Sequence, residues 1–411
     1  MKLRISRRAR EIQASPIRKL VPHAQAAKDK GKKIYHLNIG QPDIETPDLM
    51  MKAIRKFKDP VLGYGPSQGM PEYINTLVNY YNRKNFNISK EHVIICTGGS
   101  EAILFAFMAV GDFGDEVIIP EPFYTNYNSF ATQVGLKVVP ITTYAEDGFH
   151  LPPSDRIAEK ITPRTKAILI CNPNNPTGTV YTRDELAMVI GLAMKYKLFV
   201  IADEVYREFI YDGLKHISVM EFKEAEQHLI MCDSISKRFS ACGARIGVFI
   251  SKNEELMACV MKFAQGRLCP PTLEQVGAVA LHTLGESYYR RVNEEYQKRR
   301  DIVYDALSRI PGVVCRKPQG AFYVIAKLPV NDAEHYALWL LTDFDSGGES
   351  VMVAPAQGFY ASPEFGLDEI RIAYVLNSDK LTRAMEILAE SLTRYKGVKS
   401  APREAEWTSS T

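Results

Sequence analysis

Short apolar runs rich in β-forming residues alternate with long helical patterns along the chain as far as Pro270. One such helical pattern, Arg183–Tyr196, separates two of the apolar runs. Strands and helices that alternate on this scale predict an α/β fold, in which helices cover both faces of a mostly parallel sheet. The predicted strands are His92–Cys96, Glu116–Ile119, Lys137–Pro140, Ala167–Cys171, Phe199–Ala202, His228–Cys232 and Gly247–Ile250.

A different pattern begins near Pro270 and predicts a second, smaller α+β domain. A helix-rich stretch, Glu274–Leu307, comes first, and an amphipathic helix, Ser378–Tyr395, comes last. A chain of 411 residues is long for one simple core, so its length also favours two domains. The short strands predicted between the two helical stretches are Ala321–Ala326, Ser350–Val353 and Ile370–Tyr374.

The two ends of the chain differ from its body. The N-terminal segment, Ala9–Gly31, is expected to be helical or irregular, and a short apolar strand, Ile34–Ile39, follows it. The polar tail, residues 399–411, is expected to be disordered.

Composition and charge exclude several classes of protein. The net charge of +3 gives no electrostatic reason to expect binding to nucleic acid or to a membrane. The longest apolar run, about Ala102–Val110, is too short to span a bilayer, and no signal peptide is visible. The seven cysteines form no C-x-x-C pair and no H-E-x-x-H motif is present, so neither a disulfide framework nor a metal site is expected. A cytoplasmic location fits these features best.

The segment S-I-S-K-R-F-S-A-C-G-A-R-I-G, which starts at Ser234, presents a lysine where α/β proteins bind ligands. Lys237 follows the predicted strand His228–Cys232, and small residues around it would let a planar ligand approach the backbone. Arg245 adds a positive charge suited to phosphate, and a lysine amine can form an imine with a carbonyl cofactor. The pattern S-x-x-K also occurs in serine acyl-enzymes, but the K-T-G that they require is absent.

A carboxylate that suits such a cofactor comes at the end of another strand. Pyridoxal cofactors need a protonated pyridine nitrogen, and a buried carboxylate beside that nitrogen favours the charged form. Asp203 follows the apolar run Phe199–Ala202, where an unpaired carboxylate would be costly. Capping of the next turn is the structural alternative for Asp203. Tyr206 follows three residues later and is either a hydrogen-bond donor to the cofactor or a half-buried aromatic residue.

Two more turns at strand ends have the composition of ligand-binding loops. Asn172–Gly178, N-P-N-N-P-T-G, must turn rather than continue as a helix, and it could place the amide of Asn175 over the cofactor and the substrate. Thr97–Glu101, T-G-G-S-E, opens an apolar helix, where free N–H groups and the helix dipole favour a phosphate.

Arg371 lies inside an apolar strand pattern, E-I-R-I-A-Y, near the end of the chain. A charged residue in such a strand needs a partner, and a guanidinium pairs bidentately with a carboxylate. An amino-acid substrate would supply that carboxylate, and a structural ion pair is the alternative.

Together these motifs resemble the class I aminotransferases of fold type I, which use pyridoxal 5'-phosphate (PLP), and especially their bacterial aspartate aminotransferase-like branch. The resemblance extends from about Arg7 to Tyr395 and keeps the order of the family's motifs. These motifs are L-N-I-G-Q-P-D, Y-G-P-S-Q-G, T-G-G-S-E-A, N-P-N-N-P-T-G, A-D-E-V-Y, S-I-S-K-R-F and R-I-A-Y.

The resemblance implies the catalytic residues and the residues that bind substrate. Lys237 would hold PLP as a Schiff base and shuttle the proton, and Asp203 would pair with the pyridine nitrogen. Asn175 and Tyr206 would contact the phenolate oxygen of the cofactor. The residues implied for the substrate carboxylate are Arg371, Asn175 and the main chain of Gly40.

The resemblance also implies how the rest of the cofactor is held. Tyr124 would stack on the cofactor ring, and Tyr64 would reach the phosphate in a neighbouring subunit, so a homodimer with shared active sites is expected. The residues implied for the phosphate of the same subunit are Gly99, Ser100, Glu101, Ser234 and Arg245.

The fold implied by the resemblance has a large PLP-binding domain, residues 46–295, with a mostly parallel seven-stranded sheet. Residues 1–45 and 296–398 would form the small domain, which would close on substrate. The implied reaction moves an α-amino group from an L-amino acid to a 2-oxo acid, expected to be 2-oxoglutarate, by a ping-pong mechanism.

Other functions remain open on the same scaffold. A carbon–sulfur lyase or a cyclopropane-forming synthase would use the same lysine, aspartate and arginine. A PLP-binding regulator usually carries an N-terminal DNA-binding domain, whereas the aminotransferase pattern begins here almost at residue 1. The donor also remains open among aspartate, aromatic amino acids, alanine and branched-chain amino acids, because either Ile17 or Arg18 could face its side chain.

Overall fold

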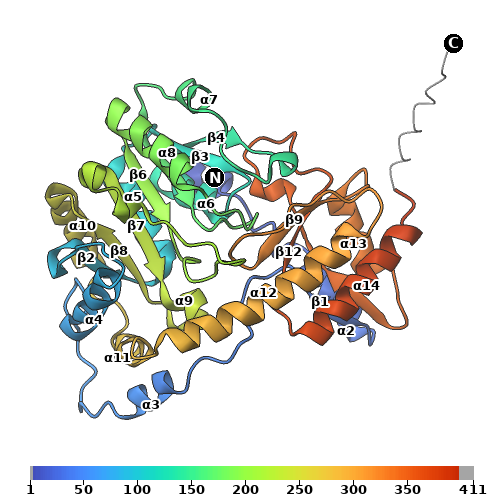
Figure 1. Ribbon diagram of the computed structural model, residues 1–411, viewed down its shortest axis with the longest axis horizontal. Coiled ribbons are helices and arrows are strands. Elements are labelled where there is room, and N and C mark those ends of the chain that lie inside the picture. Colours follow the sequence, from blue (N-terminus) through green and yellow to red (C-terminus); the bar gives the residue numbers. More distant parts are fainter. Residues whose placement is uncertain (1–2, 398–411) are drawn as a thin grey trace.

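The computed structural model describes residues 3–397 of the chain (Figure 1). The tail predicted to be disordered, residues 399–411, lies outside the described residues. A seven-stranded sheet occupies one side of the molecule, and two smaller sheets occupy the other.

The seven-stranded sheet is mostly parallel, as predicted. Its strand order is β2-β8-β7-β6-β5-β3-β4, and β8 runs antiparallel to both of its neighbours whereas the other four pairings are parallel. The strands are β2 Val93–Cys96, β3 Glu116–Glu121, β4 Lys137–Thr142, β5 Thr165–Cys171, β6 Phe199–Asp203, β7 Leu229–Ser234 and β8 Gly247–Ser251.

Each predicted strand of this sheet is present, and most extend further than predicted. Strands β6 and β7 continue to Asp203 and Ser234, so these two polar residues form the strand ends rather than following them. The apolar runs are explained by burial on both faces. In β6, Val200 and Ala202 point into one hydrophobic cluster and Ile201 points into the other, which is the alternation expected of a strand.

Helices cover both faces of this sheet. Helix α8, Arg183–Tyr196, has the predicted bounds, and α5 begins at Gly98 rather than Ala102, so the glycines lie inside its first turn. The other helices of this part are α3 Leu49–Arg55, α4 Pro71–Asn82, α6 Asn126–Val134, α7 Ser154–Ala158, α9 Ile235–Arg238, α10 Glu254–Arg267 and α11 Thr272–Leu281.

The second part contains two small sheets. β9 Tyr323–Lys327, β12 Glu369–Ala373 and β11 Ala354–Pro355 form an antiparallel sheet with β12 in the centre. β1 Lys33–His36 pairs in parallel with β10 Glu349–Met352, so the start of the chain lies beside its last quarter. Helices α2 Val21–Asp29, α13 Ala333–Thr342 and α14 Ser378–Arg394 pack around these strands.

A long helix, α12 Glu286–Ser308, crosses the lower part of Figure 1 from one side of the molecule to the other. The helix-rich stretch predicted over Glu274–Leu307 is therefore two helices, because α11 ends at Leu281 and α12 begins after Gly285. The predicted division into domains at residues 46–295, 1–45 and 296–398 stays a prediction.

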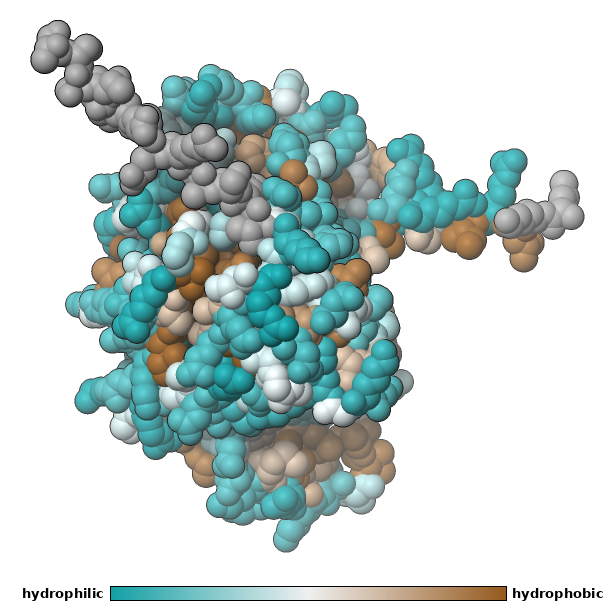
Figure 2. Space-filling model, turned by 90° about the vertical axis from the view of Figure 1, so that its right-hand side faces the viewer, coloured by the Kyte–Doolittle hydropathy of each residue, from teal (hydrophilic) through white to brown (hydrophobic). Residues whose placement is uncertain are grey.

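The N-terminal segment is partly helical. α1 Arg7–Glu11 precedes α2, and an irregular stretch joins them. Figure 2 shows the start of the described chain as a narrow arm that projects from the body and carries hydrophobic residues. Leu3 and Ile5 in this arm are 92% and 65% exposed.

The remaining elements are short 3-10 helices: η1 Lys90–His92, η2 Ala145–Asp147, η3 Val219–Glu221, η4 Lys223–His228, η5 Cys242–Ala244 and η6 Gln357–Phe359. Among the helices described for residues 3–397, none is long and apolar enough to cross a membrane.

Candidate active site

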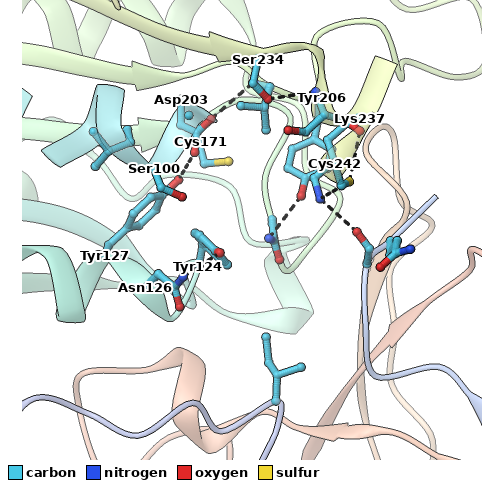
Figure 3. Close-up of a pocket in the computed structure, with 18 of the residues that line it drawn as sticks. Ser100, Tyr124, Asn126, Tyr127, Cys171, Asp203, Tyr206, Ser234, Lys237 and Cys242 are labelled. Atoms are coloured by element: carbon cyan, nitrogen blue, oxygen red, sulfur yellow. Dashed lines mark hydrogen bonds between the residues drawn. The ribbon is translucent and has the colours of Figure 1, made fainter. Parts of the chain in front are cut away.

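A cavity of about 520 Å3 opens at the carboxyl ends of β5, β6 and β7 (Figure 3). The strand ends Cys171, Asp203 and Ser234 line it, which is where open α/β sheets bind ligands. Residues from the second part of the molecule close the other side. These are Ser15, Ile17, Arg18, Ile39, Gly40, Gln41, Tyr323 and Arg371.

Lys237 reaches into this cavity from the short helix α9. The helix is capped by Ser234, whose hydroxyl accepts a hydrogen bond from Ser236 N at 3.3 Å. The Lys237 Nζ atom donates to the carbonyl oxygen of Gly40 at 3.0 Å and lies 3.8 Å from Cys242 Sγ. No carboxylate is paired with Lys237 among residues 3–397, so its amine is available for chemistry.

Asp203 is buried at the end of β6 and lies opposite Tyr127. The Tyr127 hydroxyl donates to Asp203 Oδ2 at 2.6 Å, as Figure 3 shows, and Val205 N donates to Oδ1 at 3.3 Å. Burial raises the pKa of Asp203 to about 6, and these hydrogen bonds and the charge of Lys237 oppose that rise. A buried carboxylate whose pKa is raised is stabilised in its charged form by a cationic partner, such as a protonated pyridine nitrogen.

A chain of hydrogen bonds joins Arg371 to Tyr206. Arg371 donates to Asn175 Oδ1 at 3.1 Å, and Asn175 Nδ2 donates to the Tyr206 hydroxyl at 3.4 Å. The Tyr206 hydroxyl is also 2.9 Å from the hydroxyl of Tyr323. The loop N-P-N-N-P-T-G thus places a single amide between the arginine and the tyrosine pair.

Arg371 has no acidic partner among the described residues. It is 1% exposed, and its guanidinium lies between the rings of Tyr323 and Phe359, at 4.6 and 4.8 Å from their centroids. It donates to the Asn38 carbonyl at 2.5 Å, but its Nε has no hydrogen-bond partner, and burial lowers its pKa. A buried guanidinium that has a free N–H donor can bind the carboxylate of a substrate.

The other end of the cavity has the features of an anion-binding site. Gly99, Ser100, Ser234 and Arg245 line it, and the first turn of α5 leaves its N–H groups without intrahelical partners. At Gly98, φ is +79° and a Cβ would lie 2.3 Å from an Arg245 nitrogen, so a larger residue would displace the arginine. This cradle fits the phosphate of PLP.

Glu101 and Tyr64 do not line the cavity. The Glu101 carboxylate turns back to accept from Thr97 N at 2.7 Å and lies 3.5 Å from Arg267 Nε, so only its backbone could contribute to the anion site. Tyr64 is 85% exposed on the surface.

Tyr124 and Gly40 do line the cavity. The Tyr124 hydroxyl accepts from Asn126 Nδ2 at 2.8 Å, and burial raises the pKa of Tyr124 to about 12. A Cβ at Gly40 would lie 1.8 Å from the Tyr323 hydroxyl, so this position requires glycine. The Gly40 loop therefore touches both Lys237 and Tyr323.

Sequence reasoning missed Tyr127, Tyr323, Asn38 and Cys242. Tyr127 follows Tyr124 by three residues on α6, and this helical spacing is the one signal that could have suggested it. Cys242 lies five residues after Lys237 in the same segment, and Asn38 contacts Arg371 outside the cavity lining. Tyr323 is brought to the cavity by a tertiary contact, because it lies 117 residues from its partner Tyr206.

Comparison with known proteins points to one family. The sequence pattern of the family "Aminotransferase class I and II" matches residues 32–388. An aspartate aminotransferase of Pyrococcus horikoshii is 31% identical over 400 residues, which cover 95% of this chain and 98% of that protein. An aspartate/prephenate aminotransferase of Thermus thermophilus is 30% identical over 396 residues, covering 95% and 99%. The solved structure of an alanine aminotransferase from Pyrococcus furiosus superposes with a TM-score of 0.86 at 32% identity, covering 95% and 100%.

The fold and the sequence pattern define a PLP-dependent transferase of fold type I. The chain belongs to the class I and II aminotransferase family and is an aminotransferase, EC 2.6.1.-. Its family implies PLP as cofactor and an amino acid and a 2-oxo acid as substrates.

Proposed function

We propose that this enzyme moves the α-amino group of an L-amino acid to 2-oxoglutarate in two half-reactions of a ping-pong mechanism. The observation that carries the proposal is the meeting of three groups in one cavity. These are the buried carboxylate of Asp203, and the amine of Lys237 and the buried guanidinium of Arg371, neither of which has an acidic partner among residues 3–397.

The cofactor would lie between Asp203 and the anion site at α5. When bound, PLP supplies a carbonyl that takes up the amino group and a pyridinium ring that withdraws electrons from the α-carbon of the substrate. Asp203 keeps the ring nitrogen protonated, and Ser100, Ser234 and Arg245 hold the phosphate. Tyr124 would contact the ring, and Tyr206 would hydrogen-bond its phenolate oxygen.

Lys237 would perform the chemistry at the α-carbon. With PLP bound, the Lys237 Nζ atom would be the group that takes the α-proton of the substrate and gives it back. Arg371 and Asn175 hold the α-carboxylate, which fixes the direction of the breaking C–H bond. The Gly40 carbonyl, 3.0 Å from Nζ, supports this role because it can hold the free amine in place.

A homodimer with shared active sites would complete the cavity. Exposed apolar residues support this proposal: Val61, Leu62 and Tyr64 are 75%, 60% and 85% exposed, and the N-terminal arm exposes Leu3. Tyr64 would reach the phosphate held by the partner. The seven free cysteines of the chain agree with a cytoplasmic location.

An absorbance spectrum of the protein loaded with PLP tests the proposal. The loaded protein is mixed with a panel of L-amino acids without any oxo acid, and 2-oxoglutarate is added afterwards. We expect the visible band of the lysine-bound cofactor to disappear with one class of donor and to return with 2-oxoglutarate. Release of ammonia and an oxo acid without an acceptor would indicate a lyase, and a band that persists with every donor would indicate binding without turnover.

A further inference from the structure

The hydroxyl of Tyr323 is a buried polar group at the cavity to which the proposed function gives no role. Tyr323 is the first residue of β9, is 2% exposed and lines the cavity. Its hydroxyl lies 2.9 Å from the Tyr206 hydroxyl, which is its one hydrogen-bond partner among residues 3–397. A buried tyrosine hydroxyl needs a partner, so the two tyrosines form a pair that the fold has to keep together.

Three contacts hold the ring of Tyr323 in this position. The ring meets that of Tyr206 nearly edge-on, with centroids 5.6 Å apart and an interplanar angle of 82°. The guanidinium of Arg371, on the neighbouring strand β12, lies 4.6 Å from the ring centroid. A Cβ at Gly40 would lie 1.8 Å from the hydroxyl, so only glycine leaves room for it. Tyr323 is therefore held by the same strand and loop that present Arg371 and Gly40 to the cavity.

The number of protons in the hydroxyl pair decides which tyrosine donates. A tyrosine hydroxyl can donate one proton, and its oxygen can accept hydrogen bonds. In the proposed function the proton of Tyr206 goes to the phenolate oxygen of the cofactor, so Tyr323 has to be the donor in the 2.9 Å bond. The Nδ2 atom of Asn175 donates to the same Tyr206 oxygen at 3.4 Å. The Tyr206 hydroxyl then receives two hydrogen bonds and gives one.

We propose that Tyr323 is a positioning residue that acts through Tyr206: its hydroxyl orients the Tyr206 hydroxyl and makes it a stronger donor to the phenolate oxygen of the cofactor. Hydrogen bonds that follow one another in a chain polarise one another, and this effect matters most in a buried site. The inference rests on the proposed function, because PLP has to be bound at Lys237 for the effect to be observed.

The ionisable proton of the lysine-bound cofactor reports the strength of this donor. That proton lies between the Lys237 nitrogen and the phenolate oxygen, and its loss leaves the negative charge of the oxygen without a positive neighbour. A strong donor to the oxygen stabilises this charge and so lowers the pKa of the lysine-bound cofactor. The visible band belongs to the protonated form, so a pH titration of the absorbance measures that pKa without any substrate.

Tyr323→Phe removes the hydroxyl and keeps the ring. We expect it to raise the pKa of the visible band by about 0.5, whereas Tyr206→Phe, which removes the donor itself, should raise it by about 1 to 2. In a Tyr206→Phe background, Tyr323→Phe should add less than about 0.2, because it acts through Tyr206. Tyr336→Phe is the matched control. It removes a buried hydroxyl bonded to Ser391 at 2.5 Å, outside the cavity, and should leave the pKa of the band unchanged.

The other ionisable groups around the tyrosine pair are the same in every variant. They are Cys171, Asp203, Tyr124 and Arg371. A difference between two titrations therefore reports the hydroxyl that was removed.

Two results would overturn the inference. One is a titration of Tyr323→Phe that coincides with that of the wild type, which would show that the hydroxyl contributes to packing alone. The other is an equal rise in pKa with and without the Tyr206 hydroxyl, which would show that Tyr323 acts on the cofactor directly. Failure of the proposed function would look different: borohydride treatment of the PLP-loaded wild-type protein would leave no cofactor attached to the peptide that contains Lys237.

Discussion

The Tyr127 hydroxyl donates a 2.6 Å hydrogen bond to the Asp203 carboxylate, and both side chains are buried. In the cofactor-free protein this pair holds a carboxylate in a place that favours its neutral form, since burial raises the pKa of Asp203 from 3.8 to about 6. The buried carboxylate of Asp203 is therefore suited to a cationic partner, and without one its burial lowers the stability of the protein at neutral pH.

The unfavourable burial of the charged carboxylate predicts that Asp203→Asn stabilises the cofactor-free protein in a pH-dependent way. Because the folded-state pKa is raised, the native protein loses stability as pH rises from about 4 through about 6. The cofactor-free variant should be more stable than the wild type by up to about 3 kcal/mol at pH 8, and the difference should vanish near pH 4. Urea unfolding across this range is the measurement, and the same difference at both pH values would contradict the prediction.

Tyr127→Phe should shift the pH dependence of catalysis. The hydroxyl lowers the pKa of Asp203, so its removal raises that pKa further and leaves more of the carboxyl neutral at pH 7. We expect kcat to fall about tenfold at pH 7 and to recover partly at pH 8.5. Tyr336→Phe removes another buried hydroxyl, bonded to Ser391 at 2.5 Å, and should leave the pH profile unchanged. Parallel profiles for wild type and Tyr127→Phe would show that the hydroxyl does not act through Asp203.

Gly40→Ala should reduce activity by displacing Tyr323. The new Cβ would lie 1.8 Å from the Tyr323 hydroxyl, which itself contacts the Tyr206 hydroxyl at 2.9 Å. We expect at least a tenfold loss of kcat/KM in steady-state assays, because a displacement of about 1 Å in an active-site side chain lowers the reaction rate strongly. Gly191→Ala in α8 meets no atom within 4 Å and serves as the control, with full activity and slightly higher stability. Wild-type kinetics in Gly40→Ala would mean that Tyr323 is free to move.

Asp233→Asn should destabilise the segment that carries Lys237. Asp233 is fully buried and accepts hydrogen bonds from Arg238, from Tyr81 at 2.7 Å and from Ser234 N at 2.6 Å. Its neutralisation leaves the buried Arg238 guanidinium uncompensated, which costs about 3 to 5 kcal/mol. Denaturant unfolding of the cofactor-free variant measures the loss.

The control for Asp233→Asn is Glu159→Gln, which breaks an exposed ion pair with Arg156 and should change the unfolding free energy by less than about 0.5 kcal/mol. Equal effects of the two substitutions would show that the buried pair contributes no more than a surface pair.

The fold could be predicted from the sequence because its strands are buried on both faces. Runs such as Ala167–Cys171 are apolar throughout, and the motifs at their ends are short and local. Lys237, Asp203 and Asn175 could be found because each follows or ends such a run. Arg371 was found for a related reason, a charge inside an apolar strand.

Most of the rest of the site depends on tertiary contacts. The sequence around Tyr127 is that of any buried residue in the helix α6, and the sequence around Tyr323 is that of any residue in the strand β9. The helix-rich stretch predicted over Glu274–Leu307 was not divided into α11 and α12, because the residues on both sides continue a helical pattern and only Gly285 interrupts it. Whether Ile17 or Arg18 faces the cavity could not be decided either, and in the structure both line it.

The pairing of β1 with β10 has a consequence for how the enzyme is made. Lys33 and its partner Glu349 are 316 residues apart, so a ribosome must add all the residues between them before β1 meets its neighbour. At about 5 to 20 residues per second this delay lasts roughly 15 to 60 s. The Gly40 loop follows β1, so it too reaches its final place only after β10 has been made. The seven-stranded sheet can therefore fold during synthesis before the pocket for the cofactor is complete.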